Sequence, residues 1–170
     1  MKLFVSLALC ALVSFAAFAA DEAKGSSKYA AEFVKHWKTA KDLTLAVADA
    51  MPPENYDFKP NPEEMSFGEQ IAHIAQGNYS YCARMSGATS SPFAKPAKFD
   101  KATVMKLAGE SFDYCSEIVS PMTDDQLNQT RGQGTVRELS MGVATHMAHH
   151  RGQVEVYLRL KNIKPPTYKF

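Results

Sequence analysis

Apolar side chains recur every three or four residues through four long stretches of this chain, and no stretch alternates apolar and polar residues as a strand would. Residues at this spacing share one face of a helix, so the pattern predicts four amphipathic helices. They cover roughly residues 27–50, 66–85, 101–119 and 135–161. Helices of this number and length are typical of a four-helix bundle, so the predicted fold class is all-α.

Capping residues and prolines mark the ends of these helices. A hydroxyl residue followed three positions later by Glu or Gln forms a capping box, in which both side chains accept hydrogen bonds from free amides of the first turn. The pattern occurs at Ser66–Glu69, Thr123–Gln126 and Thr135–Glu138, and the second of these predicts a short extra helical turn. Asp100 is the expected cap of the third helix. Prolines follow the first and third helices, because proline cannot continue a helix.

The first residues form a separate segment. Lys2 precedes an uncharged apolar run at 3–18, and Ala17-Phe18-Ala19 has the small residues that a signal peptidase site requires. We therefore predict a signal peptide at residues 1–19 and no stable membrane span after cleavage. An uncleaved anchor is the poorer interpretation, because roughly 20 apolar residues are needed to cross a bilayer. Residues 20–170 have the length of one domain, and export from a bacterial cytosol would place it in the periplasm.

Charge limits the partners of that domain. Positive and negative residues nearly balance, with a formal net charge of +1, and the lysines are scattered. A nucleic-acid partner is therefore excluded, since it would require a clustered basic face. A small-molecule substrate or ligand is the partner that we expect, and the chain could also form a homodimer.

Two histidines lie one helical turn apart in the last predicted helix. His146 and His150 are four residues apart, so both imidazoles can reach one ion. Both also fall within the apolar stripe of this helix, which is formed by Leu139, Val143, Met147, Val154, Tyr157 and Leu158. Burying two imidazoles there without partners would cost on the order of a few kcal/mol. A divalent metal would be a partner for both, since imidazole binds zinc, nickel, copper and iron. The alternative is that each histidine hydrogen-bonds a neighbouring hydroxyl or carboxylate.

A third histidine could complete the site. His73 lies in the second predicted helix on a line with Gln70, Gly77 and Ser80, whose polar or small side chains leave room beside the imidazole. This line could face a cavity or the solvent. Three histidines without a fourth protein ligand would form an open site, with a position for water or a thiol. Gln70 and Gln153, each about one turn from a histidine, are candidates for orienting the imidazoles or a bound water. No catalytic residue is identified.

Three segments form a recognisable set: 51–60 with the sequence MPPENYDFKP, 66–73 with SFGEQIAH, and 146–153 with HMAHHRGQ. In these segments the chain resembles the DinB-like (DinB/YfiT) family of metal-dependent four-helix-bundle proteins. The resemblance implies a bundle with a crossover connection between helices 2 and 3. It also implies a divalent ion, typically zinc or nickel, held by His73, His146 and His150, with His149 in a non-ligand position. Some members of the family are transferases that act with low-molecular-weight thiols.

The direction of the helices decides whether Cys82 and Cys115 can form a disulfide. Export to an oxidising compartment would permit one, and both cysteines lie near the C-terminal ends of their predicted helices. If the second and third helices run parallel, the cysteines lie toward the same end and could pair. If the helices run antiparallel, pairing is not expected.

Two hypotheses for function follow. The first is an exported metal-dependent enzyme whose ion activates a thiol or water for transfer or hydrolysis on a small molecule. The second is a non-catalytic metal-containing binding module. An enzyme needs a position on the metal that solvent can reach, whereas a fourth protein ligand would favour the structural role. Export counts against thiol chemistry, because such thiols belong mainly to the reducing cytosol.

Overall fold

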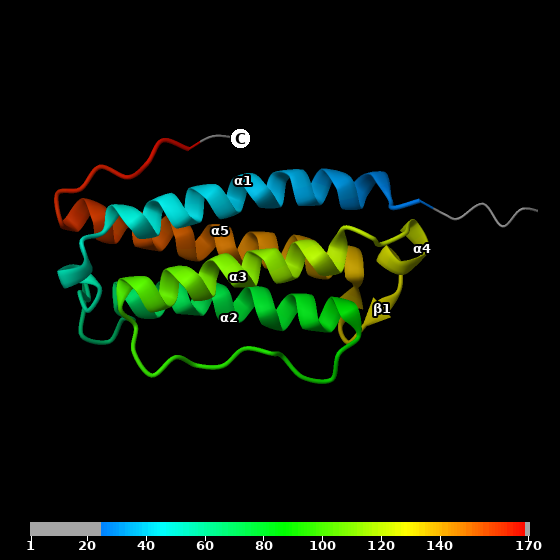
Figure 1. Cartoon of the computed structure of the whole chain (residues 1–170), viewed down its shortest axis with the longest axis horizontal. Coiled ribbons are helices and arrows are strands. Elements are labelled where there is room, and N and C mark those ends of the chain that lie inside the picture. Colours follow the sequence, from blue (N-terminus) through cyan, green and yellow to red (C-terminus); the bar gives the residue numbers. More distant parts are fainter. Residues whose placement is uncertain (1–24, 169–170) are drawn as a thin grey trace, which may run out of the picture.

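Four long helices lie side by side along the long axis of the molecule (Figure 1). They are α1 Lys28–Ala50, α2 Phe67–Ser86, α3 Lys101–Val119 and α5 Val136–Leu160. This computed structural model describes residues 25–168, so the predicted signal peptide at 1–19 lies outside the described residues. The prediction of an all-α four-helix bundle is confirmed. None of the helices within the described residues is long and apolar enough to span a membrane.

The predicted caps are present, and they explain why the predicted helix ends are right within one or two residues. The Ser66 hydroxyl accepts a hydrogen bond from the Glu69 amide, and the Glu69 carboxylate accepts one from the Ser66 amide at 2.7 Å. Complete capping boxes also begin the short helix α4 Asp124–Leu127 and the helix α5. Asp100 accepts from the Thr103 amide at 3.0 Å at the start of α3. Each box satisfies free amides at a helix N-terminus.

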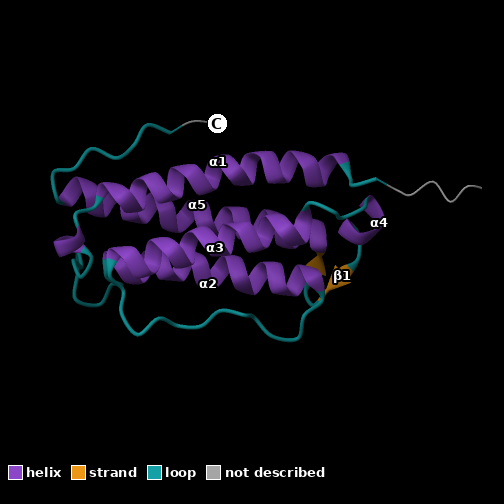
Figure 2. Cartoon of the chain, in the orientation of Figure 1, coloured by secondary structure: helices purple, strands orange, loops and turns teal. Residues whose placement is uncertain are grey.

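The expectation that no segment forms a strand was wrong in one place. A two-stranded antiparallel hairpin, β1 Thr130–Arg131 and β2 Gly134–Thr135, lies at one end of the bundle beside α4 (Figure 2). Its turn contains Gly132, with a φ of 68° that favours glycine. Strands of two residues are too short to show an alternating pattern in sequence. A 3-10 turn, Pro53–Asn55, follows α1.

The connection from α2 to α3 is a crossover. Residues 87–100 run back along the outside of α2, so that α2 and α3 point in one direction while α1 and α5 point in the other (Figure 1). The parallel arrangement brings Cys82 and Cys115 together in a disulfide with a Cα–Cα distance of 5.3 Å. Gly68 allows the crossover to return close to α2, because a Cβ at this position would overlap the backbone carbonyl of Phe99. The predicted crossover topology is confirmed.

Each long helix buries the apolar face that its sequence predicts. In α5 the six residues of the predicted stripe are all buried. Trp37 of α1 packs against Phe112 of α3 with ring centroids 4.7 Å apart, and its indole N–H donates to the Phe112 carbonyl at 3.0 Å. Helix α2 packs between α3 and α5, and α1 completes the bundle by contacting α3 and α5. This arrangement fixes which residues of α2 meet α5.

Candidate metal centre

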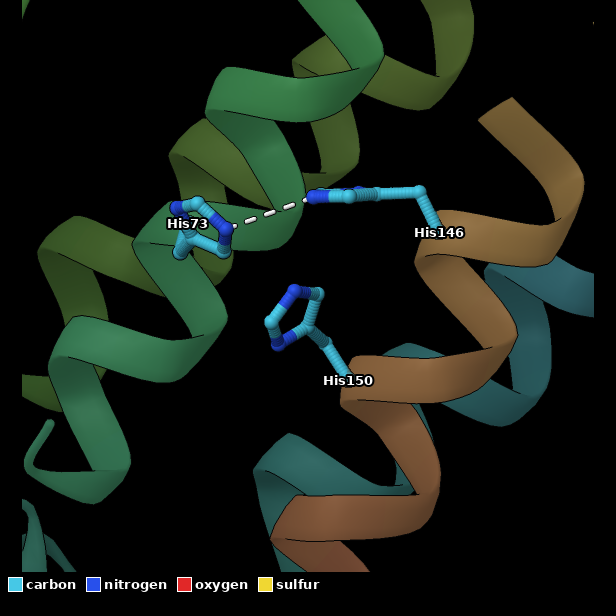
Figure 3. Close-up of side chains that lie close together, drawn as sticks. All are labelled: His73, His146 and His150. Atoms are coloured by element: carbon cyan, nitrogen blue, oxygen red, sulfur yellow. Dashed lines mark hydrogen bonds between the residues drawn. The ribbon is translucent and has the colours of Figure 1, made fainter. Parts of the chain in front are cut away.

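Three imidazoles meet where α2 faces α5. His73 of α2 points toward His146 and His150 of α5, and the three rings surround one point between the helices (Figure 3). Their ring centroids are 4.5 to 5.0 Å apart, and one ring nitrogen of each lies within 4.8 Å of the others. The Nε2 atoms of His73 and His146 are 3.3 Å apart. The structure thus brings together the three histidines that the sequence singles out.

A glycine of α2 makes this convergence possible. A Cβ at Gly77 would overlap the imidazole ring of His146, so only glycine leaves space for that ring between the two helices. His73 lies one turn before Gly77 on the same helix face, and the next turn toward the N-terminus carries Gln70. The small and polar line of α2 therefore faces α5 and its histidines, and Gly77 on this line leaves room for the His146 ring.

Gln70 connects His150 to Tyr157 within the buried part of the site. His150 is 9 % exposed, and its Nδ1–H donates to Gln70 Oε1 at 2.9 Å. The Gln70 Nε2 donates to the Tyr157 oxygen at 3.5 Å, and the Tyr157 hydroxyl donates to the Met65 carbonyl at 2.9 Å. Because the Tyr157 hydroxyl donates its proton to the Met65 carbonyl, its oxygen can only accept from the Gln70 NH2 group. The Gln70 amide therefore presents its oxygen to His150. This places the proton of His150 on Nδ1 and leaves Nε2 with a free lone pair.

Burial and mutual repulsion favour the neutral forms of His146 and His150. Desolvation, followed by the positive charges that His150 and His73 would carry, lowers the pKa of His146 to about 4. Desolvation and the neighbouring His73 also lower the pKa of His150. Neutral imidazole is the form that binds a metal ion, because each ligand nitrogen must offer a lone pair. At neutral pH His146 and His150 are therefore in the form that can bind a metal ion.

One pair of nitrogens in the cluster has the spacing that a shared metal ion requires. Two imidazole nitrogens bound tetrahedrally to zinc at about 2.0–2.1 Å are about 3.3–3.4 Å apart, and the Nε2 atoms of His73 and His146 have this separation. His150 meets the second requirement, since a metal-binding histidine usually donates its other N–H to an oxygen. His146 differs, because its Nδ1 is buried without a hydrogen-bond partner among the described residues. The three histidines could therefore hold one ion, with His146 as the ligand that lacks a hydrogen-bonded support.

The remaining residues singled out in the sequence have distinct positions. Gln153 lies near enough to His150 to oppose part of the lowering of the His150 pKa, but its buried Oε1 has no hydrogen-bond partner among the described residues. Glu69 belongs to the cap of α2 and also lies 3.6 Å from Lys59, as its assignment to the cap predicts. His149 is exposed and outside the cluster. Sequence reasoning placed Tyr157 in the buried stripe but gave it no role at the site. Its position seven residues after His150, two turns along the same helix face, was the available signal.

Comparison with known proteins identifies relatives of the whole bundle. Residues 36–154 match the family model of the DinB superfamily. The uncharacterised protein YjoA of Bacillus subtilis (strain 168) is 24% identical over 135 residues, which are 75% of this chain and 88% of that protein. The crystal structure of YjoA, described as a DinB-like protein, has a TM-score of 0.70 at 22% identity and covers 81% of this chain and 98% of that one. A DinB-like protein from Bacillus cereus ATCC 10987 has a TM-score of 0.69 at 20% identity and covers 81% and 95%.

The solved structures have the same fold as this chain. At this level of sequence identity they are evidence for the fold alone. The match to the family model is evidence for family membership, because it spans well over half of the 170 residues and includes all three clustered histidines. The chain belongs to the DinB superfamily.

Proposed function

We propose that this protein is an exported metalloenzyme of the bacterial periplasm. In this proposal His73, His146 and His150 hold one divalent ion, zinc or nickel. The ion serves to activate water or a thiol for hydrolysis or transfer on a small molecule. The proposal rests on the observation that three imidazoles converge, and that the nitrogens of His73 and His146 have a separation suited to one bound ion.

The set of ligands favours an enzyme over a binding module. No cysteine, aspartate or glutamate within residues 25–168 joins the three histidines at ligand distance. Three protein ligands are typical of catalytic zinc sites, in which the fourth position is left to water or substrate. When bound, a divalent ion can lower the pKa of water to about 7 or deprotonate a thiol.

The protein residues would orient the ligands and the bound molecule. Gln70 fixes the tautomer and the ring orientation of His150 through the hydrogen bond to Nδ1. The unpaired Oε1 of Gln153 can accept a hydrogen bond from an O–H or N–H group of a molecule at the site. The Cys82–Cys115 disulfide supports the proposed export, because disulfides persist mainly in oxidising compartments.

Metal analysis of the purified protein tests the site directly. Wild type should carry about one ion per chain and His150→Ala far less than one, since two histidines rarely retain a divalent ion. His149→Ala is the matched control, because it removes a neighbouring imidazole that lies outside the cluster, and it should keep the ion. Equal and substoichiometric metal in all three proteins would disprove the site.

A cobalt-substituted sample separates the enzyme from the binding module. Addition of 2-mercaptoethanol should produce an intense thiolate–cobalt absorption band if the ion has a position open to solvent. An unchanged visible spectrum would favour the non-catalytic module. Export is tested separately by expressing the full chain in a bacterial host. The periplasmic product should begin at Ala20, and a cytosolic product that retains Met1 would contradict export.

A further inference from the structure

The crossover leaves a cleft between itself and α2. This cleft has a volume of about 560 Å³, which is within the range of about 300–1,000 Å³ typical of small-molecule sites. Its floor includes Ala72, His73 and Gln76 of α2. Its opposite wall is formed by the crossover and includes Phe93, Lys95 and Phe99. The position of the crossover beside α2 is visible in Figure 1.

Two phenylalanines hold the crossover over the cleft. Phe93 packs near Tyr79 of α2, with ring centroids 6.5 Å apart, and Phe99 packs against the hydrophobic core. At Gly68 the backbone of α2 comes so close to the Phe99 carbonyl that a Cβ would not fit. Both ends of this wall are therefore anchored, and the cleft exists before any ligand binds.

The cleft contains a cation without a carboxylate partner. The Lys95 ammonium lies 5.8 Å from the centre of the Phe99 ring and forms no ion pair within the described part of the chain. The acidic residue of the lining, Glu69, already accepts a hydrogen bond from the Ser66 amide and lies 3.6 Å from Lys59. An anionic group in the cleft would thus meet Lys95 while the Glu69 charge is compensated by its own partners.

We propose that this cleft binds a small organic carboxylate with an aromatic or similarly apolar body. The carboxylate would pair with Lys95, and the apolar body would pack against Phe93, Phe99 and Ala72. His73 belongs both to the cleft lining and to the histidine cluster, so a molecule in the cleft lies next to the proposed metal centre. The cleft is then the substrate site of that centre, and this last statement rests on the proposed function.

Fluorine NMR with two probes of equal shape tests the binding. The probes are 4-fluorophenylacetate and the neutral 4-fluorophenylacetamide, titrated into zinc-loaded protein. An exposed ion pair contributes about 0.2–1 kcal/mol, so the acid should bind up to about fivefold more tightly than the amide. Lys95→Met should abolish this preference, whereas Lys98→Met, a lysine of the same segment outside the lining, should retain it. Phe93→Ala should weaken both probes. Absence of binding in wild type, or equal effects of the two lysine substitutions, would overturn the proposal.

Two further samples distinguish ligand binding in the cleft from metal binding by the histidines. His150→Ala should lose the metal but keep the preference for the acid, because His150 does not line the cleft. A different result is that wild type holds no stoichiometric metal and still prefers the acid in a Lys95-dependent way. That result would disprove the proposed function and would support ligand binding in the cleft. In cobalt-loaded wild type the fluorine line of the bound acid should broaden relative to the zinc form, because the paramagnetic ion is near. Equal line widths would disprove the connection between the cleft and the metal.

Discussion

The two faces of α2 that contact neighbouring helices are built in opposite ways. Toward α3 the helix is joined covalently through Cys82 and Cys115, and Asn78 Nδ2 donates to Ser111 Oγ at 3.0 Å inside the core. Toward α5 it presents the line that includes Gln70, His73 and Gly77, where polar side chains and a glycine that leaves room for the His146 ring replace apolar side chains.

The two faces of α2 therefore have different functions: the face toward α3 holds the helix in place, and the face toward α5 forms the histidine site. Three ligands from two helices stay within bonding distance of one ion only if the helices keep their register to within about 0.5 Å. The disulfide to α3 restrains α2 from the side that has no part in the site. The face toward α5 can then use small and polar residues at the expense of apolar packing. The two faces should therefore respond differently to substitution, one in stability and the other in metal affinity.

Removal of the disulfide should have the largest effect on stability. The double variant Cys82→Ala and Cys115→Ala opens a loop with a sequence separation of 33 residues. Its free energy of unfolding should fall by about 3–4 kcal/mol, because the bond restricts the unfolded chain. Denaturant unfolding measures this change, and wild type under reducing conditions should show the same loss. Metal stoichiometry measured in the absence of denaturant should be unchanged. A variant that is as stable as wild type would mean that the packing of α2 against α3 does not depend on the disulfide for its stability.

Gly77→Ala should act on the other face. Alanine normally stabilises a helix interior relative to glycine by about 1 kcal/mol, but here its Cβ would overlap the His146 ring and displace it. Metal affinity should fall by up to about a hundredfold, the upper end for changes outside the ligand set. Competition with a chromophoric chelator measures the affinity. If affinity is retained, His146 is not a ligand in the position seen here.

Gln70→Leu should weaken metal binding less, by about tenfold, because His150 remains present but loses the acceptor that orients its ring. Gln70→Glu keeps an oxygen opposite Nδ1 and should restore most of the affinity, which a purely structural role of Gln70 would not explain. The same chelator competition compares the three proteins. Equal affinities for the leucine and glutamate variants would show that the hydrogen bond to His150 has no role in binding.

Local features of the sequence explain why the fold and the three histidines could be predicted. Capping residues such as Ser66 and Thr135 act within one turn, and the spacing of His146 and His150 follows from helix geometry alone. The pairing of Cys82 with Cys115 is different, since it depends on the direction of one helix relative to another. The sequence alone therefore left the pairing open.

Features that depend on packing between segments were not predictable. The hydrogen bonds from His150 through Gln70 to Tyr157 depend on the axial register between α2 and α5, which no local pattern encodes. The cleft under the crossover depends on residues 87–100, whose sequence has no periodicity that would indicate which side chains face α2. Gln70 and His150 could be named from the sequence, while their contacts required the structure. The residues of the cleft under the crossover could not be named in advance.

Gly152→Ala should have the smallest effect and provides the control for Gly77→Ala. Gly152 lies in α5 two residues after His150, it is exposed, and a Cβ there would meet no atom within 4 Å. Alanine should therefore stabilise the protein by roughly 0.5–1 kcal/mol through helix propensity and leave metal affinity unchanged. Thermal unfolding and the chelator assay measure the two quantities. A loss of metal affinity similar to that of Gly77→Ala would mean that the site responds to any stiffening of its helices. An effect confined to Gly77→Ala would show that the space beside His146 is the requirement.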